Sequence, residues 1–229
     1  QNYLAVEEFS RIPWLVHGFG LAGFDLESLK LDFRLADFQP VEMKQEHSTR
    51  VLVVDRPPDR KVAGDALITP KAGLLLVVKT ADCLPIFLVD TEHQLVAAVH
   101  GGWRGTAGRI AETAFETMRK SFSTRPDQTL AALGPAIEAR CYEVGQEVYD
   151  FFLRQGFPPD RIFLPEDRAG QFFLDLKAAN FWLLSEVLGL QAENILPLEL
   201  CTFCRPDLLS HRRQPDDQAR LINFIGIKD

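Results

Sequence analysis

The stretch KTADCLPIFLVDTEHQLVAAVHGGWRGT (79–106) decides the fold of this chain. Two apolar runs within it, 83–90 and 95–100, are rich in Val, Ile, Leu and Phe, and a short polar segment separates them. Such runs bounded by turn residues are typical of β-strands. The spacing therefore predicts that the two runs form an antiparallel hairpin.

The predicted hairpin brings Cys83 and His100 to one face of the sheet. A turn centred on 91–92 sets Cys83 opposite His100, whereas a four-residue loop at 91–94 sets Pro85 opposite His100. Because side chains alternate between faces along a strand, the two residues share a face in either register. They could then share a metal ion or pair as nucleophile and base. Alternatively, the cysteine is inert packing and the histidine makes a structural hydrogen bond.

The segment after His100, GGWRGTAGR, is rich in glycine and carries Arg104 and Arg109 at the start of a predicted helix. Helix N-termini present free N–H groups and favour anions. The segment therefore fits a site for phosphate or another oxyanion, although a flexible turn with solvated arginines has the same composition.

A catalytic metal site needs a third ligand. His47 comes just before a predicted strand, whose end can reach the end of a neighbouring strand, and His211 is the second candidate. His93 lies in the hairpin turn, too far from Cys83 and His100. Three Cys/His ligands leave a tetrahedral zinc ion with one open position, at which it activates water or polarises a substrate oxygen.

Short strands and helices are interspersed along the rest of the chain. Further strands are predicted at 50–55, 73–79, 129–134, 195–200 and 220–227. Helices are predicted at 106–122, 143–156 and 174–189. The segments 56–65 and 165–171 are predicted loops rather than domain boundaries. Because this is not a regular βαβ repeat, we expect a single α/β sandwich domain over 1–229, with a mixed, largely antiparallel sheet covered by helices.

The composition narrows the possible functions. The 229 residues are 46% hydrophobic, enough for a sizeable core, and carry a net charge of −7. This acidic balance argues against a nucleic-acid or anionic-membrane partner, and no apolar run reaches the length of a membrane span. The N-terminus lacks the pattern of a signal peptide, and four cysteines do not resemble a disulfide framework. We therefore expect a cytoplasmic protein.

Six motifs cover the chain from about residue 40 onward: QEHSTRV, GDALIT, TADCLPIFLVD, AAVHGGWRGT, LGPAIEARCYEVG and CTFCRPDLLSHRR. They resemble the YfiH-like family, whose members are variously called multicopper polyphenol oxidases, purine nucleoside phosphorylases and peptidoglycan editing factors. The block TADCLPI followed by AAVHGGWRGT is very specific to that family.

The resemblance implies an α/β sandwich related to that of a bacterial toxin that deamidates glutamine with a Cys–His pair. It implies zinc bound by His47, Cys83 and His100, which makes the choice of His47 firmer than spacing alone. The activity it implies is phosphorolysis of adenosine, inosine and methylthioadenosine to a base and ribose 1-phosphate. Deamination of adenosine to inosine is implied as well.

The sequence departs from the family near the N-terminus. The family usually has His-Gly-Phe followed by Thr-Arg-x-Gly-Gly, whereas this chain reads HGFGLAGFDLESLK (17–30). Ser48 also follows His47 where glycine is frequent in the family. If this region lines the substrate pocket, substrate specificity or activity differs from that of the family.

Counting ligands argues against copper oxidase chemistry, so we expect Zn²⁺ rather than Cu²⁺. A multicopper oxidase needs about eight histidines beside a His₂Cys blue-copper centre, and this chain has five histidines in total. The His-x-Glu and Pro-Cys-x-x-Cys signature of cytidine deaminases is absent. CTFC (201–204) is a single Cys-x-x-Cys, for which loop packing is the favoured explanation. Cys141 either lines the pocket or is a buried structural thiol.

The leading prediction is a zinc-dependent purine nucleoside phosphorylase that takes a purine nucleoside and phosphate, with adenosine deaminase as an additional activity, acting as a monomer or homodimer. Cys83 and His100 are the predicted catalytic residues. Arg104 and Arg212 are predicted to balance the charge of the oxyanion. Asp82 neighbours Cys83 on a strand and should point to the opposite face, which predicts a supporting role.

Two other functions remain open. In metal-free hydrolysis, Cys83 is the nucleophile and His100 the base, which would suit the removal of a wrongly incorporated amino acid from a peptidoglycan precursor. In a binding or assembly module, neither residue is catalytic. Stoichiometric zinc that is lost on Cys83→Ala favours the zinc enzyme, and purine binding without base release favours the module.

Overall fold

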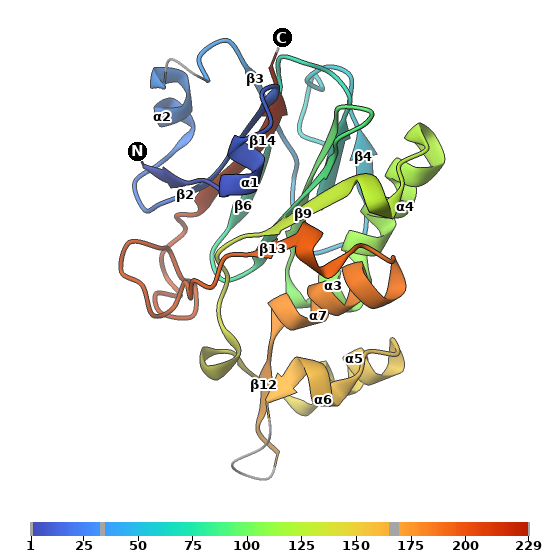
Figure 1. The fold of residues 1–229 in the computed structure, drawn as a ribbon. Coiled ribbons are helices and arrows are strands. Elements are labelled where there is room, and N and C mark those ends of the chain that lie inside the picture. The colour runs from blue at the N-terminus through green and yellow to red at the C-terminus, as the bar shows by residue number, and fades with distance from the viewer. Residues whose placement is uncertain (1, 33–34, 165–169, 229) are drawn as a thin grey trace.

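Two β-sheets stacked face to face form the centre of the protein (Figure 1). The computed structural model describes residues 2–32, 35–164 and 170–228, so the predicted loop at 165–171 lies mostly outside the described residues. Within those ranges, one sheet has the strand order β1-β2-β14-β6-β3 and the other has the order β13-β9-β7-β8-β5-β4. The expected α/β sandwich is confirmed.

The first sheet contains strands from both ends of the chain. Its strands are β1 (Tyr3–Leu4), β2 (Leu15–Gly20), β3 (Gln39–Glu42), β6 (Leu74–Thr80) and β14 (Leu221–Ile227). The late strand β14 lies between β2 and β6 and pairs antiparallel with both, whereas β3 runs parallel to β6. Strand β3 thereby positions the loop that follows it, which carries His47.

The second sheet contains the predicted hairpin. Its strands are β4 (Val51–Val53), β5 (Ala66–Thr69), β7 (Leu84–Asp90), β8 (Leu95–Gly101), β9 (Thr129–Leu133) and β13 (Ile195–Pro197). In the β7–β8 hairpin, Pro85 pairs with His100 and Asp90 with Leu95. The connecting loop is therefore the four-residue one at 91–94, and Cys83 lies one residue before β7.

Both faces of the central hairpin are buried, which explains its continuous apolar runs. One face packs on the first sheet, where the Phe19 and Phe87 rings stack with centroids 4.6 Å apart. The other face packs under the helices, where Ile86 and Phe115 belong to one core cluster. A strand buried on both faces has no polar side to alternate with, and its sequence is apolar throughout.

Helices cover the outer faces of the sandwich. On the second sheet lie α3 (Trp103–Ala107), α4 (Ile110–Phe122) and α7 (Leu176–Trp182), the last continuing into a π-helical turn, Leu183–Val187. In Figure 1, α5 (Gln146–Arg154) and α6 (Pro159–Ile162) lie below them, next to a small sheet of β10 (Glu143–Val144), β11 (Phe163–Leu164) and β12 (Phe172–Leu174).

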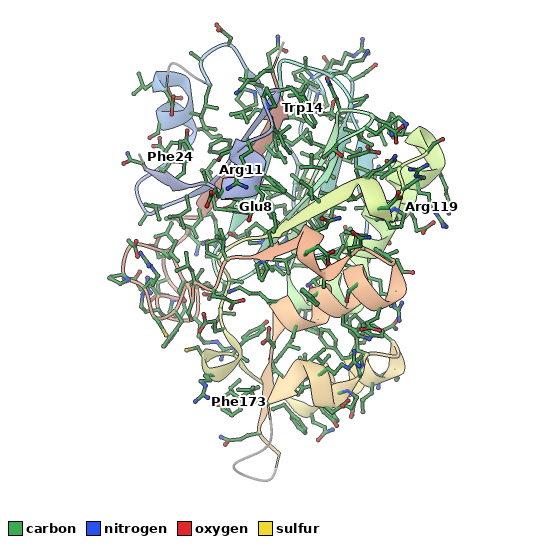
Figure 2. The ribbon with its side chains drawn as sticks, in the orientation of Figure 1. Glu8, Arg11, Trp14, Phe24, Arg119 and Phe173 are labelled. Carbon is green, nitrogen blue, oxygen red and sulfur yellow. The ribbon has the colours of Figure 1, made fainter. Side chains whose placement is uncertain are left out.

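The outer face of the first sheet has a smaller core of its own. It is covered by α2 (Leu26–Leu31), and α1 (Glu7–Ser10) precedes β2. Phe24, labelled in Figure 2, packs there on the rings of Tyr3 and Phe224. None of the helices described here is both long and apolar enough to cross a membrane.

The predicted helices form with altered boundaries. The helix expected at 106–122 starts earlier and is broken in two, because Arg109 adopts a left-handed backbone conformation (φ 65°) between α3 and α4. The first two residues of the helix expected at 143–156 belong instead to strand β10. The helix expected at 174–189 stops where Gly189 takes a φ of +78°, as glycine commonly does at helix ends.

Candidate metal centre

Three separate segments bring His47, Cys83 and His100 together at one end of the central strands of the second sheet. His47 lies in the connection between β3 and β4, Cys83 just before β7, and His100 near the end of β8. Their ligand atoms all lie within 4.8 Å of one another. The three residues predicted from the sequence therefore form one cluster that can hold a metal ion.

The spacing of the cluster fits a tetrahedral ion. The Sγ atom of Cys83 is 3.8 Å from Nε2 of His47, and the two imidazole rings have centroids 4.8 Å apart. Bond lengths of about 2.0 Å to nitrogen and about 2.3 Å to sulfur put neighbouring ligand atoms about 3.3–3.6 Å apart around zinc. Small side-chain movements are enough to reach that spacing.

Asp65 positions His100. Its buried carboxylate accepts a hydrogen bond of 2.8 Å from Nδ1 of His100, and its backbone carbonyl accepts one of 2.7 Å from the His100 N–H. With Nδ1 carrying the proton, the lone pair is on Nε2, the atom left for a metal. This carboxylate–histidine arrangement is the usual partner of a metal-binding imidazole.

The same carboxylate shapes the loop that carries His47. It accepts hydrogen bonds from the backbone N–H groups of Glu46, His47 and Ser48, at 3.3, 3.0 and 2.7 Å, and from the Ser48 hydroxyl. His47 itself is held in a left-handed conformation (φ 58°), which is uncommon for a residue with a side chain. Such strained positions concentrate at functional sites.

The charges of the cluster are strongly coupled. Burial raises the pKa of Cys83, but the neighbouring His100 and His47 outweigh it and bring that pKa down to about 6. Burial lowers the pKa of His100, but the Cys83 sulfur and the Asp65 carboxylate raise it to about 9. Without a metal, the pair is therefore a thiolate and an imidazolium near neutral pH.

Gly102 leaves the room that the cluster needs. A Cβ atom at this position would lie 2.7 Å from Cδ2 of His47 and 3.0 Å from Sγ of Cys83. Both separations are shorter than van der Waals contact, so any side chain here would displace a ligand. One glycine of the GGWRG run is thus explained by the close approach of the two ligands.

Asp82 connects the start of β7 to two other loops through its side chain and its backbone carbonyl. It has a φ of 81°, and its carboxylate accepts 2.7 Å hydrogen bonds from the Thr202 hydroxyl and from the Arg212 backbone N–H. Its carbonyl accepts one from the Ile137 N–H. These contacts tie two distant loops to the residue before Cys83. The sequence placed Asp82 on a strand with Cys83, but it lies before β7 in a left-handed conformation, so strand alternation does not set its direction.

A cavity of about 470 Å³ opens beside the cluster. Its basic side chains are Lys79, His211 and Arg220, and Gln45 lies in its wall. The Gln45 side chain bonds both backbone groups of Lys79 at 2.8 Å, which holds the segment before His47 against β6. Because the Lys79 ammonium pairs with the Glu42 carboxylate, the Arg220 guanidinium is the main positive charge that favours an anionic ligand beside the cluster.

The predicted arginines lie around Tyr142 rather than in the wall of this cavity. The Arg212 guanidinium is 5.4 Å from the Tyr142 ring and donates a 3.1 Å hydrogen bond to the Glu143 carbonyl. Arg104 stacks on Trp103 at 4.3 Å. Burial and the charge of Cys83 raise the pKa of Tyr142, and both arginines oppose that shift, so the three residues share one electrostatic environment with Cys83.

Asp65, Lys79, Tyr142 and Arg220 were not identified as site residues from the sequence. Asp65 lies within the quoted GDALIT motif, next to a glycine at the start of a strand, and this context is its one local signal. The other three reach the site through long-range packing and carry no local signal. Arg109, which the sequence placed at the helix start, instead pairs with Glu112 and the Gln155 carbonyl.

Fold and site together define an α/β sandwich protein with a His/Cys/His centre that can hold a metal ion. A family described as multi-copper polyphenol oxidoreductase laccase matches residues 27–228. The chain belongs to this family, and the resemblance to YfiH-like proteins is confirmed. The sequence match and the shared fold thus agree on one family assignment.

Relatives and solved structures match most of the chain. It is 39% identical to "Adenosine deaminase RL5" from an unknown prokaryotic organism, over 80% of this chain and 72% of that protein. It is 40% identical to "Purine nucleoside phosphorylase YlmD" from Geobacillus stearothermophilus, over 72% of this chain and 60% of that protein. The crystal structure of that YlmD superposes with a TM-score of 0.89, at 30% identity, covering 100% and 97% of the two chains. The Bacillus licheniformis hypothetical protein YfiH gives 0.89 at 27% identity, covering 99% and 97%.

Proposed function

We propose that this protein is a zinc-dependent purine nucleoside phosphorylase that also deaminates adenosine. The observation that carries the proposal is the convergence of His47, Cys83 and His100 beside a cavity whose wall includes Arg220. The names of the relatives, purine nucleoside phosphorylase and adenosine deaminase, support the substrate class. Adenosine, inosine and methylthioadenosine are the substrates that we expect.

The donor set favours zinc over a multicopper centre. One thiolate and two imidazoles are a usual ligand set for catalytic zinc. Among the described residues, the other group of three potential ligands is made of cysteines alone: Cys141, Cys201 and Cys204. The chain thus offers no second histidine cluster of the kind that a trinuclear copper site requires within the described ranges. When bound, zinc supplies a Lewis acid that polarises an oxygen of phosphate or water.

The residues of this chain orient the metal ligands and bind the anion. Asp65 fixes the His100 ring, so that Nε2 faces the cluster. Arg220 supplies positive charge in the cavity for an anion such as phosphate, whereas Lys79 is ion-paired with Glu42. Arg104 and Arg212, grouped around Tyr142, add positive charge near Cys83. Arginine is suited to bidentate contact with phosphate oxygens.

Each of the two proposed reactions forms one bond and breaks one bond. In phosphorolysis, a phosphate oxygen forms a bond to C1′ of the ribose, while the bond from C1′ to the purine nitrogen breaks and the base leaves with its electron pair and a proton. In deamination, a water oxygen forms a bond to C6 of adenine, and the amino group leaves as ammonia. Both begin with an oxygen nucleophile, so one site that polarises such an oxygen can serve both.

The direct test is base release measured by chromatography. We expect the zinc-loaded protein to release hypoxanthine from inosine only when phosphate is present, with ribose 1-phosphate as the matching product. Cys83→Ala and His100→Ala should reduce the rate by at least about 100-fold, the range typical of a lost catalytic group. His93→Ala, in the hairpin loop, is the matched histidine control and should keep the rate. Equal release without phosphate would contradict phosphorolysis.

A second function is favoured by one observation, the alignment of Cys83, His100 and Asp65. A thiolate, an imidazole and a carboxylate in this order form the arrangement used by cysteine hydrolases. In that case the metal-free protein would be active, and iodoacetamide would label Cys83 and stop the reaction. Activity that requires stoichiometric zinc would instead support the phosphorylase.

A further inference from the structure

A second cluster of potential ligands lies outside the candidate metal centre. Cys141 ends a short 3₁₀ helix (Ala139–Cys141), while Cys201 and Cys204 follow β13. All three cysteines are free, and their sulfur atoms lie within 4.8 Å of one another. The Cys141 and Cys204 sulfurs are 3.4 Å apart. The Cys-x-x-Cys pair thus meets a third thiol from 60 residues earlier in the chain.

The sulfur of Cys201 accepts a hydrogen bond from the backbone. The backbone N–H of Glu138 donates a hydrogen bond of 3.4 Å to its sulfur. A backbone N–H donor to the first sulfur of a Cys-x-x-Cys turn is the kind of outer contact that orients a metal ligand.

A metal ion satisfies all three sulfurs, whereas simple packing or a disulfide does not. Cys201 is buried and Cys141 packs against the main core, but Cys204 is exposed, so apolar packing does not account for all three thiols. A disulfide between Cys141 and Cys204 would leave the Cys201 sulfur with the Glu138 N–H as its contact and no bonded partner. Soft thiolates prefer thiophilic ions such as zinc and cuprous copper.

The cluster joins the two loops that support the candidate metal centre. The loop with Cys141 also carries Ile137, which bonds the Asp82 carbonyl. The loop with Cys201 also carries Thr202, which bonds the Asp82 carboxylate. An ion that links these loops would therefore hold Asp82, and with it the start of β7, in place.

We propose that Cys141, Cys201 and Cys204 form a second, all-cysteine site for one thiophilic metal ion, zinc or cuprous copper, that fixes these two loops to each other. The ligating thiols release their protons to the solvent on binding, and no electron is transferred. This site is independent of the proposed function, because it shares no ligand with the His47–Cys83–His100 cluster.

Metal titration of the reduced protein tests the proposal. Zinc, or cuprous copper under anaerobic conditions, is added in competition with a chromophoric chelator. We expect two equivalents for the wild type and one each for Cys83→Ser and Cys204→Ser. Substitution with cobalt separates the sites: Cys204→Ser should lose most of the thiolate-to-cobalt charge-transfer absorbance, and Cys83→Ser should keep most of it. The metal that binds more tightly identifies the occupant.

A variant-free measurement guards against misfolding of the variants. In the wild type, saturating metal should slow iodoacetamide labelling of Cys204 by at least about tenfold, and a chelator should restore it. A single equivalent in both the wild type and Cys204→Ser, with labelling that metal does not change, would overturn the proposal. So would a Cys141–Cys204 disulfide in protein purified without reductant and equilibrated with metal.

Discussion

The Asp65 carboxylate accepts a 2.8 Å hydrogen bond from Nδ1 of His100, and both side chains are buried in the second sheet. The same carboxylate accepts the backbone N–H groups of the loop that carries His47. One acidic side chain thus orients two of the three potential metal ligands. The arrangement of these two ligands therefore depends on Asp65.

Replacing Asp65 with Asn should weaken zinc binding by about 10–100-fold, the usual effect of removing the partner of a metal-binding histidine. The amide has nearly the same shape but no negative charge, and one of its two terminal atoms is a donor. The dissociation constant, measured by competition with a chelator, checks this prediction.

Asp90→Asn is the matched control for Asp65→Asn. Asp90 is also buried, accepts a 2.9 Å hydrogen bond from Nδ1 of His93, and holds the hairpin loop through backbone N–H groups. It lies at the opposite end of β7 from Cys83. Zinc affinity should be unchanged in this variant, and equal losses in the two variants would show that the role of Asp65 is general stability.

Gly102→Ala should lower zinc affinity by about tenfold or more, because the added methyl group would lie 2.7 Å from the His47 ring and 3.0 Å from the Cys83 sulfur. Gly105→Ala is the control in the same segment, since its nearest neighbours are 3.3 Å away and belong to neither ligand side chain. Chelator competition on both variants, with circular dichroism to confirm folding, checks the prediction. Unchanged affinity in Gly102→Ala would mean that the ligands do not need this space.

In the metal-free protein, Cys83 should react with iodoacetamide with a midpoint near pH 6, because His100 and His47 favour its thiolate over the thiol. The rate should be near its plateau at pH 7 and fall as the pH drops below 6. His100→Gln should move the midpoint up toward the ordinary cysteine value of about 8.5. The rate is read from the peptide that contains Cys83, which separates it from the other cysteines. The same midpoint in His100→Gln as in the wild type would contradict the thiolate–imidazolium pair.

Acid should destabilise the protein through His17. This histidine is buried in β2, accepts a 2.8 Å hydrogen bond from the Val6 N–H at Nε2, and burial lowers its pKa to about 4. The unfolded chain, with an ordinary pKa of about 6.5, takes up the proton first, so stability is lost as the pH falls from 6.5 toward 4. The loss between pH 7 and pH 5 is about 2 kcal/mol.

Urea unfolding of the wild type and His17→Gln at pH 7 and pH 5 measures the contribution of His17. The variant is expected to be less stable at both pH values, and its loss between them should be smaller than that of the wild type by about 2 kcal/mol. His93→Gln, at a partly exposed position, should keep the wild-type difference. Equal pH dependence in wild type and His17→Gln would rule out His17 as its source.

The sequence predicted the hairpin and two ligands because both are local. The apolar runs of β7 and β8 mark the strands, and period-two alternation relates Cys83 to His100 whatever the loop length. The register stayed open between two choices, since the turn residues at 91–94 do not distinguish a two-residue turn from a four-residue loop. Strand β2 was missed because His17, Gly18 and Gly20 interrupt its apolar pattern.

The rest of the site depends on long-range packing. Asp65, Lys79 and Arg220 come from three different parts of the chain, and no local pattern indicates that they meet. The left-handed backbone at His47 is imposed by hydrogen bonds to Asp65, not by the type of residue. Likewise, loop packing was the favoured explanation of CTFC, because Cys141 is distant in sequence and joins it only in the folded chain.

The most direct measurement of the central claim is an anomalous-scattering map at the zinc edge from crystals soaked with inosine and phosphate. The account predicts a zinc peak bounded by Nε2 of His47, Sγ of Cys83 and Nε2 of His100, with phosphate oxygen density at its open side. A map from zinc-saturated crystals with no peak among these three atoms would contradict it.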